Sequence, residues 1–275
     1  MKQQPTLAFI GAGNMARAII GGLINNGYPA EQIWASEPDA SKLIDLKEQG
    51  LQTTCNNCEA VTAADVVILA VKPQVLKSVL TDIATAVQSQ KPLLLSVAAG
   101  IMTSSMDQWL GGNTSIVRCM PNTPALVQAG ANGLYANGKV SNEQKELAES
   151  ILQATGITIW VDEESQLDAV TAVSGSGPAY YFLVMESMIQ AGIKLGLSEE
   201  VATQLTLQTA QGAAKMALSS DVDPAELRRR VTSPNGTTEQ AIKRFLAGGL
   251  PELFDDALQA CNDRSVELAD ELGKG

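Results

Sequence analysis

A glycine-rich stretch near the start of the chain has the residue types and spacing of a nucleotide-binding turn. The sequence Gly11-Ala12-Gly13-Asn14-Met15-Ala16 follows a short apolar segment and precedes a helical pattern that runs to about Asn26. In such a turn the first glycine permits a tight bend, the second lets the backbone approach a pyrophosphate, and alanine can replace the third. The spacing therefore predicts a dinucleotide-binding turn that ends in a helix.

A second stretch, Ser174-Gly175-Ser176-Gly177-Pro178, precedes an almost wholly apolar run at residues 179–193 that carries one charge, Glu186. A helix that is apolar all round is expected to be buried all round. Proline suits the first turn of a helix, and the small residues before it let backbone N–H groups approach a ligand. We therefore expect a bare helix N-terminus that holds an anion. The alternative is a flexible interdomain hinge capped by serine.

A third stretch, Thr232-Ser233-Pro234-Asn235-Gly236-Thr237-Thr238, is again rich in turn residues and opens a helical pattern. Two bare helix N-termini could together hold a small carboxylate through backbone N–H groups and hydroxyls, without a basic side chain. The alternative is two ordinary capped loops.

The chain contains no histidine, which removes Ser-His-Asp and Cys-His catalysis, the usual zinc enzymes and dehydrogenases with a histidine acid/base. It has four cysteines, of which Cys55 and Cys58 have the spacing of a metal or redox pair. A zinc site would need two more suitable ligands nearby, so we expect reduced thiols and no metal.

Composition sets further bounds. A chain of 275 residues with 45% hydrophobic residues suits one large domain or two ordinary ones. The formal net charge of −11 argues against nucleic acid and anionic membrane surfaces as partners. The N-terminus lacks the apolar core of a signal peptide, and residues 179–193 are short for a bilayer span. We expect a cytoplasmic protein with no membrane partner.

Strand and helix patterns place these stretches in two domains. Residues 1–164 alternate apolar strands with helices, which predicts an α/β, doubly wound Rossmann domain; residues 165–275 are expected to form an all-α domain. The strands are expected at 6–10, 33–36, 65–71, 93–97 and 115–119, with edge strands at 132–136 and 158–161. Helices of the second domain are expected at 166–173, 178–197, 199–218, 224–231, 238–247 and 251–272.

Residues at the carboxyl ends of these strands become candidates for cofactor binding, because ligands bind at that edge of a parallel sheet. Glu37 stands where the ribose of a dinucleotide would lie. With the glycine turn, the candidates are Gly11, Ala12, Gly13, Asn14, Met15, Ser36, Glu37, Ala70, Val71, Lys72, Pro73, Ala98, Ala99 and Gly100.

Taken together, these motifs resemble the pyrroline-5-carboxylate reductase family, and the match spans nearly the whole chain. The stretch from Val231 to Thr238 is similar to the signature loop of that family and is its most specific part. The other matching motifs are residues 11–16, 70–73, 118–124, 174–180 and 224–245.

The resemblance implies a Rossmann domain joined to a helical domain that interlocks with a second copy of the chain, often in larger rings of dimers. It implies NADPH or NADH as cofactor, with 1-pyrroline-5-carboxylate as substrate and L-proline as product. A cyclic imine needs a hydride at carbon and a proton at nitrogen. Its iminium form already carries that proton, so a hydroxyl that orients the nitrogen is sufficient.

The resemblance also implies residue roles. Thr238 matches the family residue that orients the imine nitrogen, and Asn57, Lys72 and residues 98–100 correspond to cofactor contacts. Glu164 matches a position near the site, although it could equally be an acid in a solvated loop. The implied substrate-binding set is Glu164, Ser174, Gly175, Ser176, Gly177, Ser233, Gly236, Thr237 and Thr238.

Two departures from the family pattern leave the preference between NADPH and NADH open. Glu37 replaces the small hydroxyl residue that receives the 2′-phosphate in many relatives, and Arg230 replaces an asparagine that contacts the cofactor in some. Two alternative functions also stay open. A β-hydroxyacid dehydrogenase would use Lys194 as acid/base, although this lysine lies at a helix end. A nucleotide-sensing regulator would bind the cofactor without catalysis.

Overall fold

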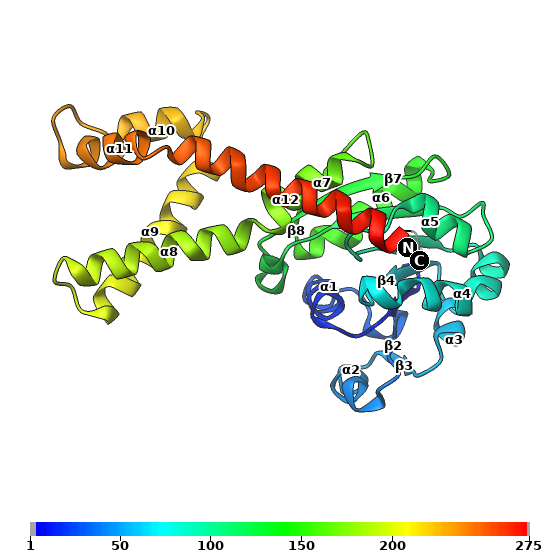
Figure 1. The fold of residues 1–275 in the computed structure, drawn as a ribbon. Helices are drawn as coiled ribbons and strands as arrows, with labels where there is room; N and C mark the ends of the chain where they lie inside the picture. Colours follow the sequence, from blue (N-terminus) through cyan, green and yellow to red (C-terminus); the bar gives the residue numbers. More distant parts are fainter. Residues whose placement is uncertain (1–3, 274–275) are drawn as a thin grey trace. The chain divides into compact units, whose positions relative to one another are not determined.

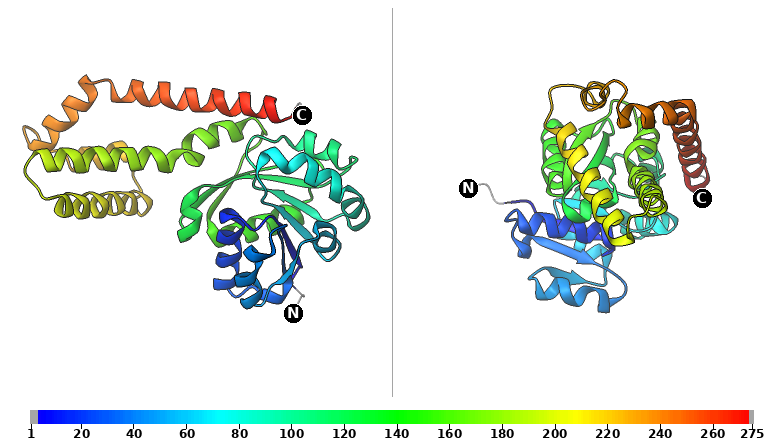
Figure 2. Two further views of the ribbon diagram at one scale, coloured as in Figure 1. Left: turned by 60° about the horizontal axis from the view of Figure 1, so that its bottom comes forward. Right: turned by 90° about the vertical axis from the view of Figure 1, so that its left-hand side faces the viewer.

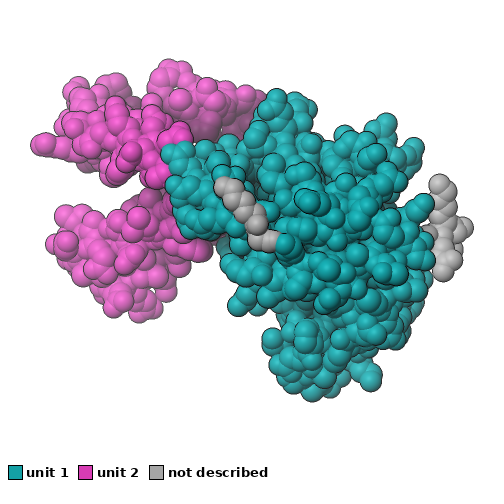
Figure 3. All heavy atoms as spheres, turned by 45° about the vertical axis from the view of Figure 1, so that its right-hand side comes forward, with its two compact units in different colours: residues 1–176, 261–275 teal, residues 177–260 magenta. Residues whose placement is uncertain are grey.

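The protein is described here by a computed structural model that covers residues 4–273. These residues form two compact units, coloured separately in Figure 3. The first holds residues up to 176 together with those from 261 onward, and the second is Gly177–Ala260. These units are defined by how compactly the residues pack. The predicted boundary between a dinucleotide-binding domain and a substrate and dimerisation domain, at residues 164 and 165, stays a prediction.

The first unit is built on one sheet with the strand order β3-β2-β1-β4-β5-β6-β7-β8 (Figure 1). In this order, the strands β3, β2, β1, β4, β5 and β6 are each parallel to their neighbours. Strand β7 runs antiparallel to β6, and β8 is parallel to β7. The order of the first six strands is that of the dinucleotide-binding fold, which confirms the expected class. The strands are β1 (Leu7–Ile10), β2 (Ile33–Ser36), β3 (Gln52–Thr54), β4 (Val66–Leu69), β5 (Leu93–Ser96), β6 (Ile116–Met120), β7 (Gly130–Ala136) and β8 (Gly156–Trp160).

Helices cover both faces of this sheet, so its central strands are apolar throughout. Every residue of β1 and of β4 is fully buried. One face packs against α1 (Asn14–Asn25), α2 (Ile44–Glu48) and α6 (Asn142–Leu152). The other packs against α3 (Asn57–Thr62), α4 (Pro73–Gln90) and α5 (Thr103–Trp109). Two cores therefore hold the strand ends in fixed positions.

The second unit is helical, as expected. It contains α8 (Gly177–Lys194), α9 (Glu199–Leu218), α10 (Pro224–Arg230), α11 (Thr237–Ala247) and the first part of α12 (Leu250–Gly273). Helices α8 and α9 lie side by side (Figure 2). Asp223 caps α10, because its carboxylate accepts the Glu226 N–H at 2.8 Å.

Helix α8 exposes much of its apolar surface in the single chain. The side chains of Tyr181, Phe182 and Leu183 are 69%, 63% and 63% exposed. Large contiguous apolar surfaces of this kind mark an interface. The apolar run that should be buried on all sides is therefore left uncovered by its own chain.

Candidate functional site

The glycine turn lies where β1 and β4 end side by side, at the point where the strand order reverses. Ile10 pairs with Leu69, so Gly11 and Ala70 follow at the same edge of the sheet. Gly11 has φ of +95°, and a Cβ atom there would lie 2.9 Å from the Ala70 carbonyl oxygen. Only glycine fits this bend.

The N-terminus of α1 is free to receive an anion. Its N-cap, Gly13, makes no side-chain cap hydrogen bond, and the first turn of the helix holds no acidic residue. A Cβ atom at Gly13 would meet nothing within 4 Å, so the backbone faces open space. Unsatisfied N–H groups at the positive end of a helix suit a pyrophosphate, so the turn fits the nucleotide expected from the sequence.

Glu37 reaches across from β2 to this turn. One of its carboxylate oxygens accepts the Ala12 N–H at 3.2 Å, and the other lies 3.3 Å from Lys42 Nζ. The Ser36 hydroxyl donates to Asn57 Oδ1 at 2.7 Å. The structure therefore brings Ser36, Glu37 and Asn57 to the end of β2, where a dinucleotide ribose binds.

The remaining cofactor candidates follow β4 and β5. Lys72 is the N-cap of α4 and Pro73 is its first residue. Residues 98–100 form the turn that leaves β5, with Ala98 buried and Ala99 exposed. Because β1, β4 and β5 are parallel neighbours, these turns lie along one edge of the sheet with the glycine turn.

Glu164 is fully engaged inside the first unit. Its Oε1 accepts from the Thr103 N–H at 2.7 Å and from Arg118 Nη1 at 2.8 Å, while its Oε2 accepts from the Thr103 hydroxyl at 2.7 Å. The side chains of Arg118 and Glu164 are only 8% and 12% exposed. Glu164 is thus not an acid in a solvated loop, and a substrate contact for it stays a prediction.

The stretch around Ser174 is not a bare helix start, which corrects the sequence-based expectation. Helix α7 (Gln166–Val170) leads into a π-helical turn, η5 (Thr171–Gly175), and only Ser176 separates this turn from α8. The Ser176 N–H donates to Thr171 O at 2.8 Å, so it is already used. A single π-helical turn within a helical path often marks a functional site.

Close packing holds this turn against the end of β6. A Cβ atom at Gly175 would lie 2.4 Å from Met120 Cε, so a larger residue would require the methionine to shift. Ser174 donates its hydroxyl to Val170 O at 3.0 Å. Ser174, Gly175 and Ser176 are therefore fixed to the same sheet as the nucleotide turn.

The loop at residues 233–238 belongs to the second unit and does open a helix as expected. Gly236 is the N-cap of α11 without a side-chain cap hydrogen bond, and Thr238 is exposed in the first turn. Glu239 accepts from Lys243 Nζ at 3.0 Å and from the Asn235 N–H at 3.1 Å. The hydrogen bond to Lys243 is the main cause that lowers the pKa of Glu239. Gly177, Ser233, Gly236 and Thr237 lie in this unit too.

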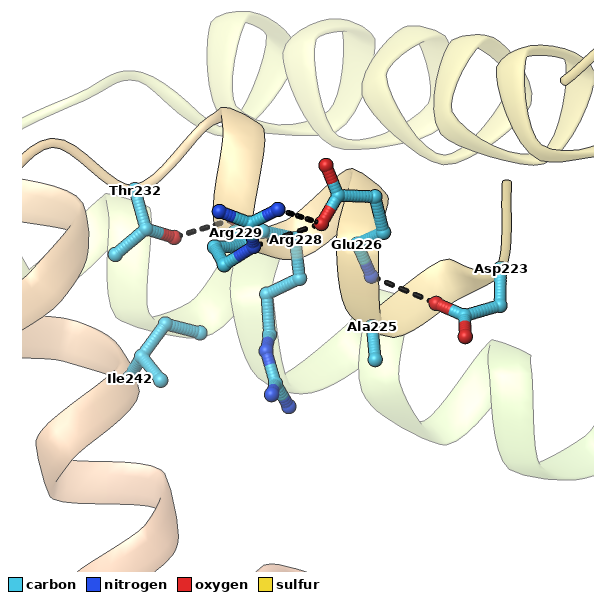
Figure 4. A pocket seen from close by; sticks show the side chains of 7 residues that line it. All are labelled: Asp223, Ala225, Glu226, Arg228, Arg229, Thr232 and Ile242. Atoms are coloured by element: carbon cyan, nitrogen blue, oxygen red, sulfur yellow. Dashed lines mark hydrogen bonds and ion pairs between the residues drawn. The ribbon is translucent and has the colours of Figure 1, made fainter. Parts of the chain in front are cut away.

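A hollow of about 510 Å³ in the second unit is shown in Figure 4. In it Glu226 pairs with Arg229, while Arg228 extends away from that pair. Arg230, also bonded to Glu226, donates from Nε at 2.8 Å. The hollow is lined by Asp223, Ala225, Glu226, Arg228, Arg229, Thr232 and Ile242, none of which was predicted as a site residue.

Within residues 4–273 no group of three or more His, Cys, Asp or Glu residues is arranged to hold a metal ion. Cys55 is exposed and Cys58 is partly buried, both as free thiols. The expectation that no metal is needed stays a prediction. In the same range no helix has the length and apolar character required to cross a membrane.

Comparison with known proteins identifies the family. The pyrroline-5-carboxylate reductase of Pseudomonas aeruginosa is 57% identical over 271 residues, which cover 98% of this chain and 99% of that protein. The chain belongs to the pyrroline-5-carboxylate reductase family. A relative from Haemophilus influenzae is 43% identical, over 97% of this chain and 98% of its own length. Two family profiles divide the chain: NADP oxidoreductase coenzyme F420-dependent matches residues 6–100, and pyrroline-5-carboxylate reductase dimerisation matches residues 164–268.

Solved structures agree with the family assignment. The pyrroline-5-carboxylate reductase of Coxiella burnetii superposes with a TM-score of 0.94 at 48% identity, covering 97% of this chain and 99% of that one. The pyrroline carboxylate reductase of Plasmodium falciparum, solved with NADP bound, gives a TM-score of 0.85 at 31% identity over 97% and 98% of the two chains. Members of this pyrroline-5-carboxylate reductase family thus share the Rossmann and helical parts seen here.

Sequence reasoning missed four residues that organise the site: Lys42, Thr103, Arg118 and Asn122. Arg118 and Asn122 lie within a motif that was recognised, yet their partners are far along the chain. Arg118 bonds a residue 46 positions away, and Asn122 one 52 positions away. One signal in the sequence could have indicated such a contact: Arg118 is a charged residue inside an otherwise apolar strand. A buried charge requires a partner, so an acidic side chain from elsewhere in the chain was to be expected.

Proposed function

We propose that this chain reduces 1-pyrroline-5-carboxylate to L-proline and uses NADPH or NADH as the hydride donor. Full-length membership of the pyrroline-5-carboxylate reductase family carries this proposal. The open glycine turn at the end of β1 supports it, since the residues there fit a dinucleotide. When bound, the reduced nicotinamide supplies a hydride.

The residues of the first unit bind and orient the cofactor in this proposal. Backbone N–H groups of residues 11–15 hold the pyrophosphate at the start of α1, and Glu37 accepts from ribose hydroxyls. The turns at residues 70–73 and 98–100 lie along the same edge of the sheet and are further candidates for contact with the cofactor.

Substrate binding needs no basic side chain in this account. The backbone N–H groups of Gly177 and of Gly236–Thr238 take the substrate carboxylate, since the Ser176 N–H already donates to Thr171 O. The hydroxyls of Ser174, Ser176 and Ser233 are further candidates for this role. The Thr238 hydroxyl orients the ring nitrogen. The iminium substrate brings its own proton, so a chain without histidine can complete the reaction.

The dimerisation profile and the exposed apolar face of α8 support a homo-oligomer in which a second copy covers that face. The finer proposals are that the protein works in the cytoplasm and binds no nucleic acid. Its net charge of −11 favours the second of these.

Kinetics of Thr238 variants test the proposed role. Thr238→Ala should lower kcat/KM for 1-pyrroline-5-carboxylate about ten- to hundredfold, since a hydrogen bond to a charged group contributes about 1.5–3 kcal/mol. Thr238→Ser keeps the oxygen and should recover most of the activity. If Thr238 serves only the first turn of α11, the folded alanine variant would turn over normally. That outcome would remove Thr238 from the mechanism.

A further inference from the structure

The π-helical turn η5 is followed by a proline that cannot donate a backbone hydrogen bond. In an α-helix the N–H of residue 178 would donate to the carbonyl oxygen of residue 174. Residue 178 is proline and has no N–H, so the sequence removes the regular donor for Ser174 O. A partly buried carbonyl without a donor is costly, so Ser174 O needs a partner from elsewhere.

Asn122 provides that partner. Its Nδ2 donates to Ser174 O at 3.0 Å, and its Oδ1 accepts the Ala131 N–H at 2.9 Å. The orientation of the amide is fixed by these neighbours, because a carbonyl can only accept and a backbone N–H can only donate. Asn122 therefore ties the π-helical turn to the end of β6 and to the start of β7.

We propose that Asn122 is a positioning residue for the substrate: by satisfying Ser174 O it holds the π-helical turn in place, and with it the Ser176 hydroxyl and the Gly177 N–H that receive the carboxylate. The proposal rests on the proposed function insofar as the stretch at 174–176 binds substrate. In this proposal Asn122 acts through the turn, since its amide is engaged by Ser174 O and the Ala131 N–H. It should therefore affect the two substrates of the reaction differently.

Asn137 offers a matched control in the same unit. It follows β7 beside the opposite end of β6 and is partly buried like Asn122. Its amide also joins backbone groups, here three, because Oδ1 additionally accepts the Lys139 N–H at 3.2 Å. Its Oδ1 accepts the Ile116 N–H at 3.2 Å, and its Nδ2 donates to Thr114 O at 3.0 Å. If both amides only stabilise the fold, substituting Asn122 and substituting Asn137 should have the same effect on the KM for the substrate.

The first test compares Asn122→Asp with Asn137→Asp. Aspartate keeps the acceptor oxygen but loses the donor, and it places a carboxylate oxygen against the carbonyl. Asn122→Asp should raise the KM for 1-pyrroline-5-carboxylate about tenfold, the ratio expected for one neutral hydrogen bond, and leave the KM for NADPH within about twofold. Hydrogen exchange at the Ser176 amide should become about tenfold faster. Asn137→Asp should change neither quantity.

The proposal is overturned if both variants change the substrate KM equally, or if Asn122→Asp leaves this KM and the Ser176 exchange rate at their wild-type values. Hydrogen exchange does not depend on turnover. If wild-type protein failed to reduce 1-pyrroline-5-carboxylate, the proposed function would fail while the exchange rates still decided whether Asn122 holds the turn.

A second test addresses the physical cause and does not depend on activity. Pro178→Ala restores an N–H that can donate to Ser174 O. Urea denaturation of Asn122→Ala, Pro178→Ala and the double variant forms a double-mutant cycle. The loss of stability caused by Asn122→Ala should fall to about half or less in the Pro178→Ala background. An equal loss in both backgrounds would show that Asn122 does not compensate for the proline.

Discussion

The contacts of Glu164 allow one prediction to be worked out in detail. The variant Glu164→Gln keeps the size of the side chain but removes its charge, which leaves Arg118 without a counter-ion in a place where its side chain is 8% exposed. It also removes an acceptor from the start of α5. That helix has no side-chain cap from its own N-cap residue and no acidic residue in its first turn, so Glu164 is its acidic partner from 61 residues away.

The magnitude follows from burial. Removing one partner of a buried ion pair costs about 3–5 kcal/mol, because the other charge stays buried without compensation. Glutamine can still accept one hydrogen bond from Thr103, so the lower end of that range, about 3 kcal/mol, is expected. This is a large part of the roughly 5–15 kcal/mol that stabilises a native protein.

Urea denaturation at a fixed protein concentration measures this loss, since the stability of an oligomer depends on concentration. Glu163→Gln is the control: Glu163 is the exposed neighbour, and its variant should stay within about 0.5 kcal/mol of wild type. The paired variant Glu164→Met with Arg118→Met should recover most of the loss, because it leaves no unpaired charge. Wild-type stability for Glu164→Gln would refute this account of the pair.

Two further predictions concern the cofactor and the assembly. Glu37→Ser should raise the NADPH-to-NADH ratio of kcat/KM about tenfold, or ~1.4 kcal/mol, because the carboxylate next to the Ala12 N–H repels a 2′-phosphate. An unchanged ratio in steady-state assays with both cofactors would show that Lys42 already neutralises the Glu37 carboxylate. Light scattering should give a mass of at least two chains, because α8 leaves Tyr181 and Phe182 mostly exposed in one chain; a fully active single chain would contradict this.

The sheet was largely predictable because its strands are short apolar runs between turn residues. Strand β3 was missed since Gln52, Thr53 and Thr54 are polar and lie at the edge of the sheet. Helix α5 was missed for a different reason. Its start is stabilised by a carboxylate from a distant part of the chain, which no local pattern reveals.

The nucleotide turn was also predictable, because its glycines are needed for local reasons: Gly11 for a bend with positive φ, and Gly13 for an open backbone at the start of α1. The stretch at 174–178 does lead into helix α8, with Pro178 in the first turn as expected, but it is not a bare start, because the π-helical turn η5 precedes it. In the structure the same proline follows an existing helical path, and the carbonyl it leaves open is bonded by Asn122. Local rules cannot separate these two outcomes, because the deciding contact joins residues 52 positions apart.

The central claim is that hydride passes from the reduced nicotinamide to the ring carbon of the imine. Incubating the protein with 1-pyrroline-5-carboxylate and a cofactor that carries deuterium at the transferring position of nicotinamide C4 tests it directly. Mass spectrometry and NMR should find L-proline with deuterium at C5, formed in equal amount with the oxidised cofactor. Oxidised cofactor without deuterated proline, or no proline at all, would contradict the proposed reaction.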